Sequence, residues 1–466
     1  MTFCNPVGRS ARRRWPKLAF LMGFVGALVL LAPPGMTPAH AQNNAVFALR
    51  DTETEELLKS YEVPLARAAG LDVNAVHVYV LGDNEVNAFA TDPEDIFILA
   101  GMLLYVRNPN ELIGVMAHET GHLAAGHLLR GSDAMSKAMI PMLLSLVVGL
   151  AVMVAGGGEA GLAVMGIGQA IAEGQFVKFS QVQESSADQI GARLLNQTHQ
   201  SPMGMYNTFV RFAQEEARAS AHIDPYAADH PVGQERVSSL QDIVDSSPYR
   251  DVPDPPQSVR ALSMVQAKLA GFILPVNEVL RRYPVTDTSA TARYARAMAY
   301  MRKPELQHAL DEINSLIKDE PDNPYFYEVL GQIHVMMAKP LLGVPAYQRA
   351  VSLKPQAPQL RAALATAQLA TDDPALAPAA LSNLKAALLV EPEDPFTWYE
   401  MAQAYSNMKN PPMADLATAE SNYNGGNYRQ AVVFAGRARR GLTQGGADWQ
   451  RANDIILAAT AAAKNQ

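Results

Sequence analysis

The sequence contains one short motif with the residue types of a hydrolytic metal site, His118-Glu119-Thr120-Gly121-His122. On a helix, residues four apart lie on one face, so His118 and His122 present two imidazoles to a single ion. Glu119 lies about 100° further round the helix, where it can activate a water molecule without binding the metal. The motif therefore predicts a zinc site in which Glu119 is the general base of a hydrolytic reaction.

A two-histidine site needs a third protein ligand and one open coordination position. Glu184 is the candidate ligand, and Asp188, one turn further along the same helix face, would orient a ligand imidazole. An isolated E-x-x-x-D pattern is usually a solvated helix face, so this reading depends on the upstream histidine pair. His127 is a poorer candidate, because it lies about 180° round the helix from His118.

The first 41 residues have every part of a secretory signal peptide. Basic residues between 9 and 17 precede an apolar run at 18–31, and Ala39-His40-Ala41 forms a cleavage site. We expect residues 1–41 to be removed on export, which places the protein in the periplasm. The alternative is an uncleaved N-terminal anchor.

The composition excludes several function classes. Loss of the five basic residues of the leader changes the formal net charge from −8 to −13, which argues against nucleic acid as a partner. The leader also carries Cys4, the only cysteine. The exported chain therefore has no disulfide, no cysteine nucleophile and no cysteine–zinc site, so His and carboxylate side chains must hold any metal.

The elements around the motif alternate in character. Apolar periodicity and turn residues predict helices at 53–69, 110–130 and 181–195, and strands at 76–81 and 95–100. We expect Asn110 to cap the motif helix. The metal motif should thus lie on a helix beside a small β-sheet, in a domain that we place at residues 42–250.

Residues 138–172 contain two uncharged runs, 138–155 and 160–172. The first approaches the roughly 20 residues that cross a bilayer. The second, at ~1.5 Å per residue, is too short to return across it, and His122 and Glu184 must meet on one side. We therefore favour an apolar helical hairpin over the active-site cleft, with peripheral membrane contact, over a transmembrane pair.

The C-terminal part repeats itself. Pro321 and Pro355 are 34 residues apart, which is the period of a tetratricopeptide repeat. Small residues recur where the two helices of each repeat would cross, at Ala309, Gly343 and Ala380. We expect a linker and helix at 251–288 and an all-α repeat solenoid at 289–466, which would offer a concave surface to peptides or protein partners.

Taken in order, these motifs resemble one gluzincin family of zinc metallopeptidases. The resemblance rests on H-E-x-x-H and E-x-x-x-D, on V-N-A-F-A at 86–90, and on His230-Pro231 and Arg236 downstream. The family includes the CAAX prenyl protease, HtpX and the BepA-like periplasmic β-barrel assembly-enhancing proteases. An exported catalytic domain joined to repeats is most similar to the last group. The expected fold is mainly α with a small β-sheet: an α+β gluzincin-type metallopeptidase domain followed by an all-α tetratricopeptide-repeat solenoid.

The resemblance implies roles for residues that spacing alone does not assign. His118, His122 and Glu184 would bind one Zn²⁺ per chain. His230 would stabilise the oxyanion or bind zinc in a resting state, and Arg236 would lie by the metal. Substrate-binding residues would be Asn87, near the substrate backbone, with Ile98 and Gly101, on or at the end of an edge strand that pairs with substrate.

Two functions follow from these expectations. The first is an envelope quality-control endopeptidase that cleaves misfolded or stalled exported and outer-membrane proteins. Its repeats would dock polypeptide substrates or the outer-membrane assembly machinery. The second is a chaperone or scaffold for outer-membrane protein assembly, in which the repeats act and the protease site is latent. Cleavage by the purified protein separates the two.

Overall fold

The computed structural model describes residues 48–92, 94–126, 181–218, 230 and 233–464. The expected signal peptide, Cys4, His127 and the apolar hairpin at 138–172 lie outside these residues. The described chain forms two compact units, divided between Pro321 and Asp322. We call them the N-terminal unit and the C-terminal unit. The domain limits expected at residues 250 and 289 stay predictions.

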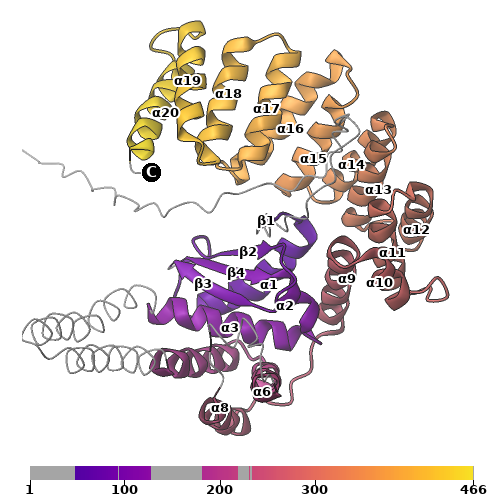
Figure 1. Cartoon of the computed structure of the whole chain (residues 1–466), viewed down its shortest axis with the longest axis vertical. Helices are drawn as coiled ribbons and strands as arrows, with labels where there is room; N and C mark the ends of the chain where they lie inside the picture. Colours follow the sequence, from indigo (N-terminus) through magenta and orange to yellow (C-terminus); the bar gives the residue numbers. More distant parts are fainter. Residues whose placement is uncertain (1–47, 93, 127–180, 219–229, 231–232, 465–466) are drawn as a thin grey trace, which may run out of the picture. The chain divides into compact units, whose positions relative to one another are not determined.

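The N-terminal unit contains a four-stranded sheet and mainly helices around it (Figure 1). Its elements are β1 (Ala48–Leu49), α1 (Thr52–Ala68), β2 (His77–Leu81), β3 (Ala88–Asp92), β4 (Asp95–Leu99), α2 (Ala100–Tyr105), α3 (Pro109–Ala125), a helical stretch over residues 181–197, α6 (Met203–Arg218), α8 (Gln234–Ser246), α9 (Pro256–Ile273), α10 (Val276–Arg282), α11 (Ala290–Arg302) and α12 (Leu306–Asp319). The helices expected at 53–69, at the metal motif and from 181 are confirmed.

The strand order is β1-β2-β4-β3. β4 pairs in parallel with β2 and antiparallel with β3, so both of its edges are hydrogen-bonded. The expectation that the strand ending at Gly101 is an edge strand is therefore wrong. Ile98 lies in the middle of the sheet with no exposed surface, and Gly101 already belongs to α2. We no longer propose either residue as a substrate contact.

The motif helix α3 begins two residues earlier than expected. Its N-cap is Asn108, whose side chain accepts a hydrogen bond from the Glu111 amide at 2.9 Å, and Pro109 occupies the first turn. Asn110, the expected cap, instead donates to the Ser201 carbonyl at 2.6 Å and accepts from the Gly204 amide. It thereby ties α3 to the start of α6. The helix ends at Gly126, which adopts a left-handed conformation with φ 62°.

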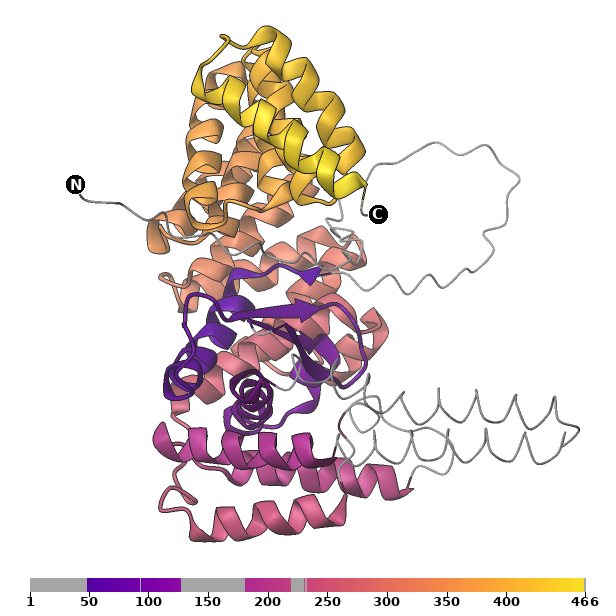
Figure 2. The ribbon, with the colours of Figure 1, turned by 90° about the vertical axis from the view of Figure 1, so that its left-hand side faces the viewer.

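The C-terminal unit is all-α in its described residues, and successive helices lie side by side (Figure 2). They are α13 (Pro324–Met336), α14 (Pro340–Leu353), α15 (Pro358–Leu369), the short 3-10 helix η1 (Pro374–Leu376), α16 (Ala377–Val390), α17 (Pro395–Asn407), α18 (Pro411–Asn424), α19 (Tyr428–Gly441) and α20 (Ala447–Ala463). A Cβ built on Gly343 would lie 2.9 Å from the Gly331 carbonyl, so α13 and α14 cross as closely as the repeat pattern predicts. The helical-repeat fold is confirmed.

Within the described residues, no helix combines the length with the apolar character that crossing a membrane would take.

Candidate metal centre

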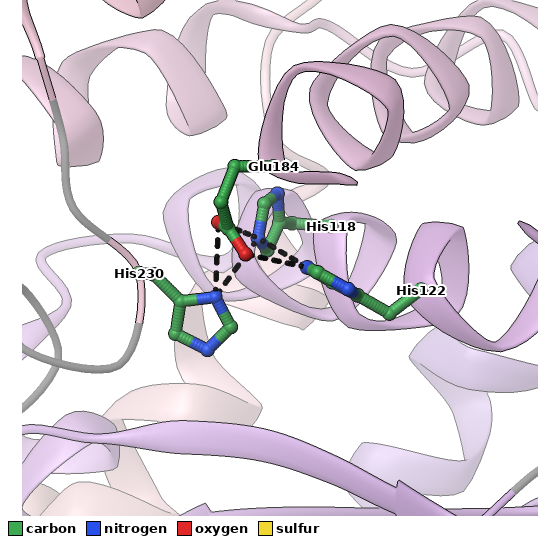
Figure 3. Close-up of side chains that lie close together, drawn as sticks. All are labelled: His118, His122, Glu184 and His230. Carbon is green, nitrogen blue, oxygen red and sulfur yellow. Dashed lines mark hydrogen bonds and ion pairs between the residues drawn. The ribbon is translucent and has the colours of Figure 1, made fainter. Parts of the chain in front are cut away.

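Four side chains from three parts of the chain converge at one point inside the N-terminal unit (Figure 3). His118 and His122 come from α3, Glu184 from the helix at 181–197, and His230 from the segment before α8. Each offers one ligand atom, and these four atoms lie within 4.8 Å of one another. The side chains are buried: His118 has no exposed surface and Glu184 is 4 % exposed.

The spacing of these atoms fits a tetrahedral zinc site. His118 Nε2 lies 3.1 Å from His122 Nε2 and 3.3 Å from His230 Nδ1. The carboxylate of Glu184 lies 3.3 Å from each of His118 and His122 and 3.1 Å from His230. Four N and O ligands at about 2.1 Å from zinc form a tetrahedron with edges of about 3.4 Å. The donor set, three imidazoles and one carboxylate, is also one that zinc accepts.

The electrostatics of the cluster also favour a cation. Burial lowers the pKa of His118, but hydrogen bonds to Asp188 and Glu184 outweigh it and raise the pKa to about 9. Burial also raises the pKa of Glu184, but hydrogen bonds from the three histidines hold it well below its usual range. Positive charge is therefore stabilised at this point. Burial lowers the pKa of His122 to about 4, which keeps its nitrogen lone pair available to a metal.

Asp188 and Arg236 support the cluster from behind. His118 Nδ1 lies 3.0 Å from Asp188 Oδ1, which directs the opposite ring nitrogen toward the metal position. Arg236 donates two hydrogen bonds to Asp188, both of 2.8 Å, and its Nη1 lies 3.1 Å from Glu184 Oε2. Arg236 thus contacts carboxylates, which favours a positioning role over a catalytic one. Phe209 of α6 packs edge-on against the His118 ring, with 5.3 Å between ring centroids.

Two glycines let the helices that carry these ligands approach closely. A Cβ on Gly121 would lie 2.7 Å from the Ala187 carbonyl, and one on Gly191 would lie 2.9 Å from the Ala117 carbonyl. Real Cβ atoms do not come so close to backbone, so α3 and the helix at 181–197 could not cross here with larger residues. The crossing places Glu184 and Asp188 one turn apart on either side of Ala187, facing His118.

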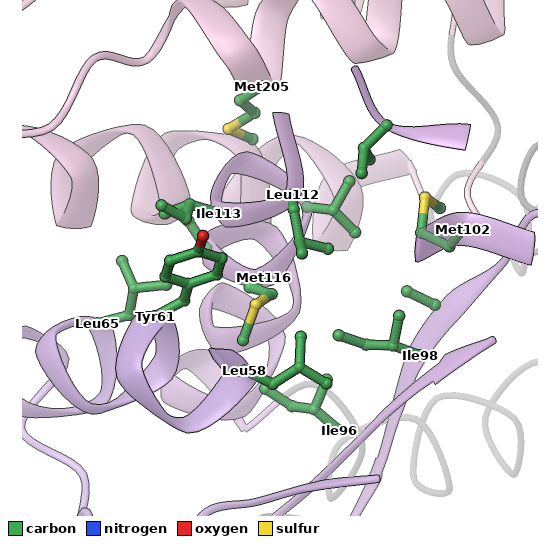
Figure 4. Close-up of a cluster of buried hydrophobic side chains, with 14 of the residues drawn as sticks. Leu58, Tyr61, Leu65, Ile96, Ile98, Met102, Leu112, Ile113, Met116 and Met205 are labelled. Carbon is green, nitrogen blue, oxygen red and sulfur yellow. The ribbon is translucent and has the colours of Figure 1, made fainter. Parts of the chain in front are cut away.

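The hydrophobic core holds α3 against the sheet and α1 (Figure 4). Leu112 and Met116 project from α3 into a cluster that includes Leu58 of α1 and Ile96 and Ile98 of β4. Because these side chains have no exposed surface, the orientation of α3 is fixed about its own axis. The face that carries His118 and His122 then turns toward the helix at 181–197.

Glu119, the expected general base, is fully buried beside the cluster. Its Oε1 lies 3.7 Å from His230 Nε2. Burial raises its pKa, and this outweighs the opposing effects of His230, His118 and the Ala90 backbone on β3. A carboxylate whose proton affinity has been raised in this way suits the transfer of a proton from water. Its nearness to Ala90 puts the site at the outer side of β3.

The sequence also concealed a buried carboxyl group near the motif. Glu62 of α1 is 3 % exposed, and its Oε1 lies 2.9 Å from the Thr120 hydroxyl. Burial raises the pKa of Glu62 to about 8. Thr120 also bonds to the Met116 carbonyl at 2.7 Å, so the second x of H-E-x-x-H is Gly at a helix crossing and the first joins α3 to α1. The apolar period of 53–69 predicted α1 but not this contact.

Comparison with known proteins places the same residues in a peptidase. Residues 52–244 match the model of peptidase family M48. The metalloprotease LoiP of Escherichia coli (strain K12) is 34 % identical over 184 residues, which are 38 % of this chain and 67 % of LoiP. The beta-barrel assembly-enhancing protease of Yersinia pestis is 24 % identical over 390 residues, 81 % of this chain and 78 % of the relative. The structure of YrrB, a TPR protein with an unusual peptide-binding site, covers 37 % of this chain and 89 % of its own, with a TM-score of 0.31 and 21 % identity.

Proposed function

The chain belongs to peptidase family M48, and from this premise we propose that it cleaves peptide bonds at the cluster of His118, His122, Glu184 and His230. The protein is a zinc-dependent metallopeptidase of that family. The observation that carries the assignment of the site is the convergence of four buried ligand atoms within 4.8 Å. We assign zinc to His118, His122 and Glu184, with His230 as the fourth ligand of a resting state.

The residues around the metal position would share the work of hydrolysis. Zinc, when bound, supplies Lewis acidity toward the scissile carbonyl and toward water. Glu119 takes the proton of the attacking water and passes it to the leaving amine. Asp188 and Arg236 hold His118 and Glu184 in their ligand orientations.

The substrate would lie along β3. In the described part of the chain β3 pairs only with β4, so its other side is an edge of the sheet. An extended polypeptide can add to such an edge through main-chain hydrogen bonds. Because Ala90 lies beside Glu119, a strand bound there would bring its backbone to the metal position. Asn87 immediately precedes β3, is 6 % exposed, and keeps its proposed place near the substrate backbone.

The biological setting follows from the leader pattern and the relatives. We assign the protein to the periplasm, on the basic, apolar and A-x-A segments of residues 1–41. Its extended likeness to a beta-barrel assembly-enhancing protease supports a role in the quality control of exported and outer-membrane proteins. The helical repeats of the C-terminal unit would dock polypeptide substrates or the assembly machinery, and residues 138–172 would supply peripheral membrane contact.

Removal of the metal tests the proposed function. The purified exported protein should contain one zinc per chain and cleave an unfolded polypeptide such as casein. A chelator should abolish this cleavage, and stoichiometric zinc should restore it, because His and carboxylate ligands alone hold the ion. Elemental analysis and gel-resolved digestion measure both. Cleavage that continues in protein shown to be free of metal would refute the assignment.

His230 favours the second candidate function, a scaffold with a latent protease. Its Nδ1 completes the tetrahedron, and a catalytic zinc site needs that position for substrate or water. We expect His230→Ala to raise casein cleavage by about tenfold or more, because it removes the closed state from the population. Zinc content should stay at one per chain.

Two outcomes would contradict the latch. If His230→Ala cleaves no faster than the native protein, His230 does not limit access to the metal. If the variant keeps its zinc and cleaves nothing, while the native protein cleaves, His230 acts in the reaction itself, as an oxyanion-stabilising residue would.

A further inference from the structure

Three aromatic side chains form a row across the sheet. Tyr79 on β2 is directly opposite Phe97 on β4, and Phe97 is directly opposite Phe89 on β3. The rings are stacked, with 5.2 Å between the centroids of Tyr79 and Phe97 and 5.4 Å between those of Phe97 and Phe89. Their neighbours along β4, Ile96 and Ile98, are fully buried on the core face. Because strand side chains alternate between faces, the row lies on the opposite face, where its members are partly exposed.

The row ends at the strand that lies beside the metal centre. Leu99 donates its amide to the Asn87 carbonyl at 2.9 Å, so the backbone groups of Asn87 and Phe89 face β4. In an antiparallel pair the alternate residues, Ala88 and Ala90, then direct their backbone groups to the outer side of β3. Ala88 is fully buried, whereas Phe89 and Ala90 are partly exposed. The accessible edge therefore starts at Phe89 and continues beside Glu119.

A strand added to this edge would extend the row. Its backbone would pair with the outward groups of Ala90, and one of its residues would stand directly opposite Phe89. That position is a non-hydrogen-bonded pair, in which side chains approach most closely. Its side chain would lie on the aromatic face, next to the last ring of the row.

We propose that Phe89 determines specificity, by selecting an aromatic or β-branched side chain at the one substrate position opposite it. The inference rests on the proposed function. The preferred substrates are extended segments in which such residues alternate with small or polar ones, because only alternate side chains reach this face. Unfolded strands of membrane β-barrels have this alternation and carry aromatic residues near both ends. Phe89 thus names a substrate class, amphipathic β-strand segments, that the metal centre alone does not define.

Cleavage-site profiling tests the proposal on the full-length zinc-loaded protein. A mixture of unfolded proteins is digested by the native enzyme, by Phe89→Ala and by Tyr79→Ala, and mass spectrometry aligns the products at their scissile bonds. The native enzyme should show one position near the scissile bond with an aromatic preference. Phe89→Ala should reduce that preference by about 2–10-fold, and Phe89→Trp should retain it. Tyr79→Ala is the matched control, because it breaks the same row two strands from the edge and should leave the preference unchanged.

The outcomes separate this proposal from the proposed function. A native enzyme that cleaves nothing, even as His230→Ala, would overturn the proposed function. A native enzyme that cleaves without a preference at any aligned position would overturn only the role of Phe89. The same holds if Phe89→Ala and Tyr79→Ala change the preference equally, because the row would then act through the stability of the sheet. Circular dichroism of both variants shows whether the sheet is intact.

Discussion

Replacing Glu119 with Gln is expected to lower peptide-bond cleavage by about 10²–10⁴-fold, the range that general-base catalysis contributes. Gln has nearly the shape of Glu, so the buried position beside His230 stays filled. It cannot accept a proton, so the attacking water is no longer activated. The zinc content should remain one per chain, because Glu119 is not among the four converging ligand residues. The measurement is kcat/KM on an unfolded substrate, with zinc determined in the same preparation.

Glu62→Gln is the matched control for this variant. Glu62 is a second buried carboxyl group near Glu119, and burial raises its pKa to about 8, so it is largely neutral at pH 7. A neutral isostere that keeps the hydrogen bond to Thr120 should change cleavage little. If Glu119→Gln retains native activity, or if it loses activity only through loss of zinc, Glu119 is not the base.

Replacing Arg236 with Leu is expected to destabilise the N-terminal unit by about 3–5 kcal/mol, the usual cost of removing one partner of a buried ion pair. Arg236 is 8 % exposed and Asp188 is 4 % exposed, and their two 2.8 Å hydrogen bonds satisfy both carboxylate oxygens. Without the guanidinium, the Asp188 charge stays buried with His118 as its remaining partner. Hydrogen exchange resolved by mass spectrometry should therefore show lost protection in α3.

The C-terminal unit is an internal reference in the same experiment, because amides of α17 should keep their protection. The double variant Arg236→Leu with Asp188→Leu should recover part of the loss, since removing both partners leaves no uncompensated charge. Unchanged exchange of α3 in Arg236→Leu would show that the pair does not support the metal centre. Equal loss of protection in α17 would point to general misfolding.

Much of this architecture could be predicted from local patterns. The helical period fixes which face of α3 carries His118 and His122, and a period of 34 residues identifies helix pairs, because both depend only on neighbours in the chain. Caps were less predictable. Asn108 and Asn110 have the same side chain, and only contact with Ser201 and Gly204 recruits Asn110 away from the helix end.

Strand pairing could not be predicted in this way. The alternation of residues 95–99 identifies a strand but not its neighbours, because pairing joins residues distant in sequence. β4 became a central strand when β3, which the sequence showed only as the V-N-A-F-A motif, paired with its far side. The edge available to substrate, and the end of the aromatic row at Phe89, follow from that order of strands.

By itself, the sequence determined the chemistry of the protein: two imidazoles on one helix face, a carboxylate between them and no competing thiols. It determined the repeat architecture for the same reason, since both are periodic signals within single helices. Only the tertiary structure decided that Glu184, His230 and Arg236 meet His118. That meeting depends on Gly121 and Gly191 allowing two helix backbones to cross within the reach of an ion, and such a crossing is a property of packing between distant segments.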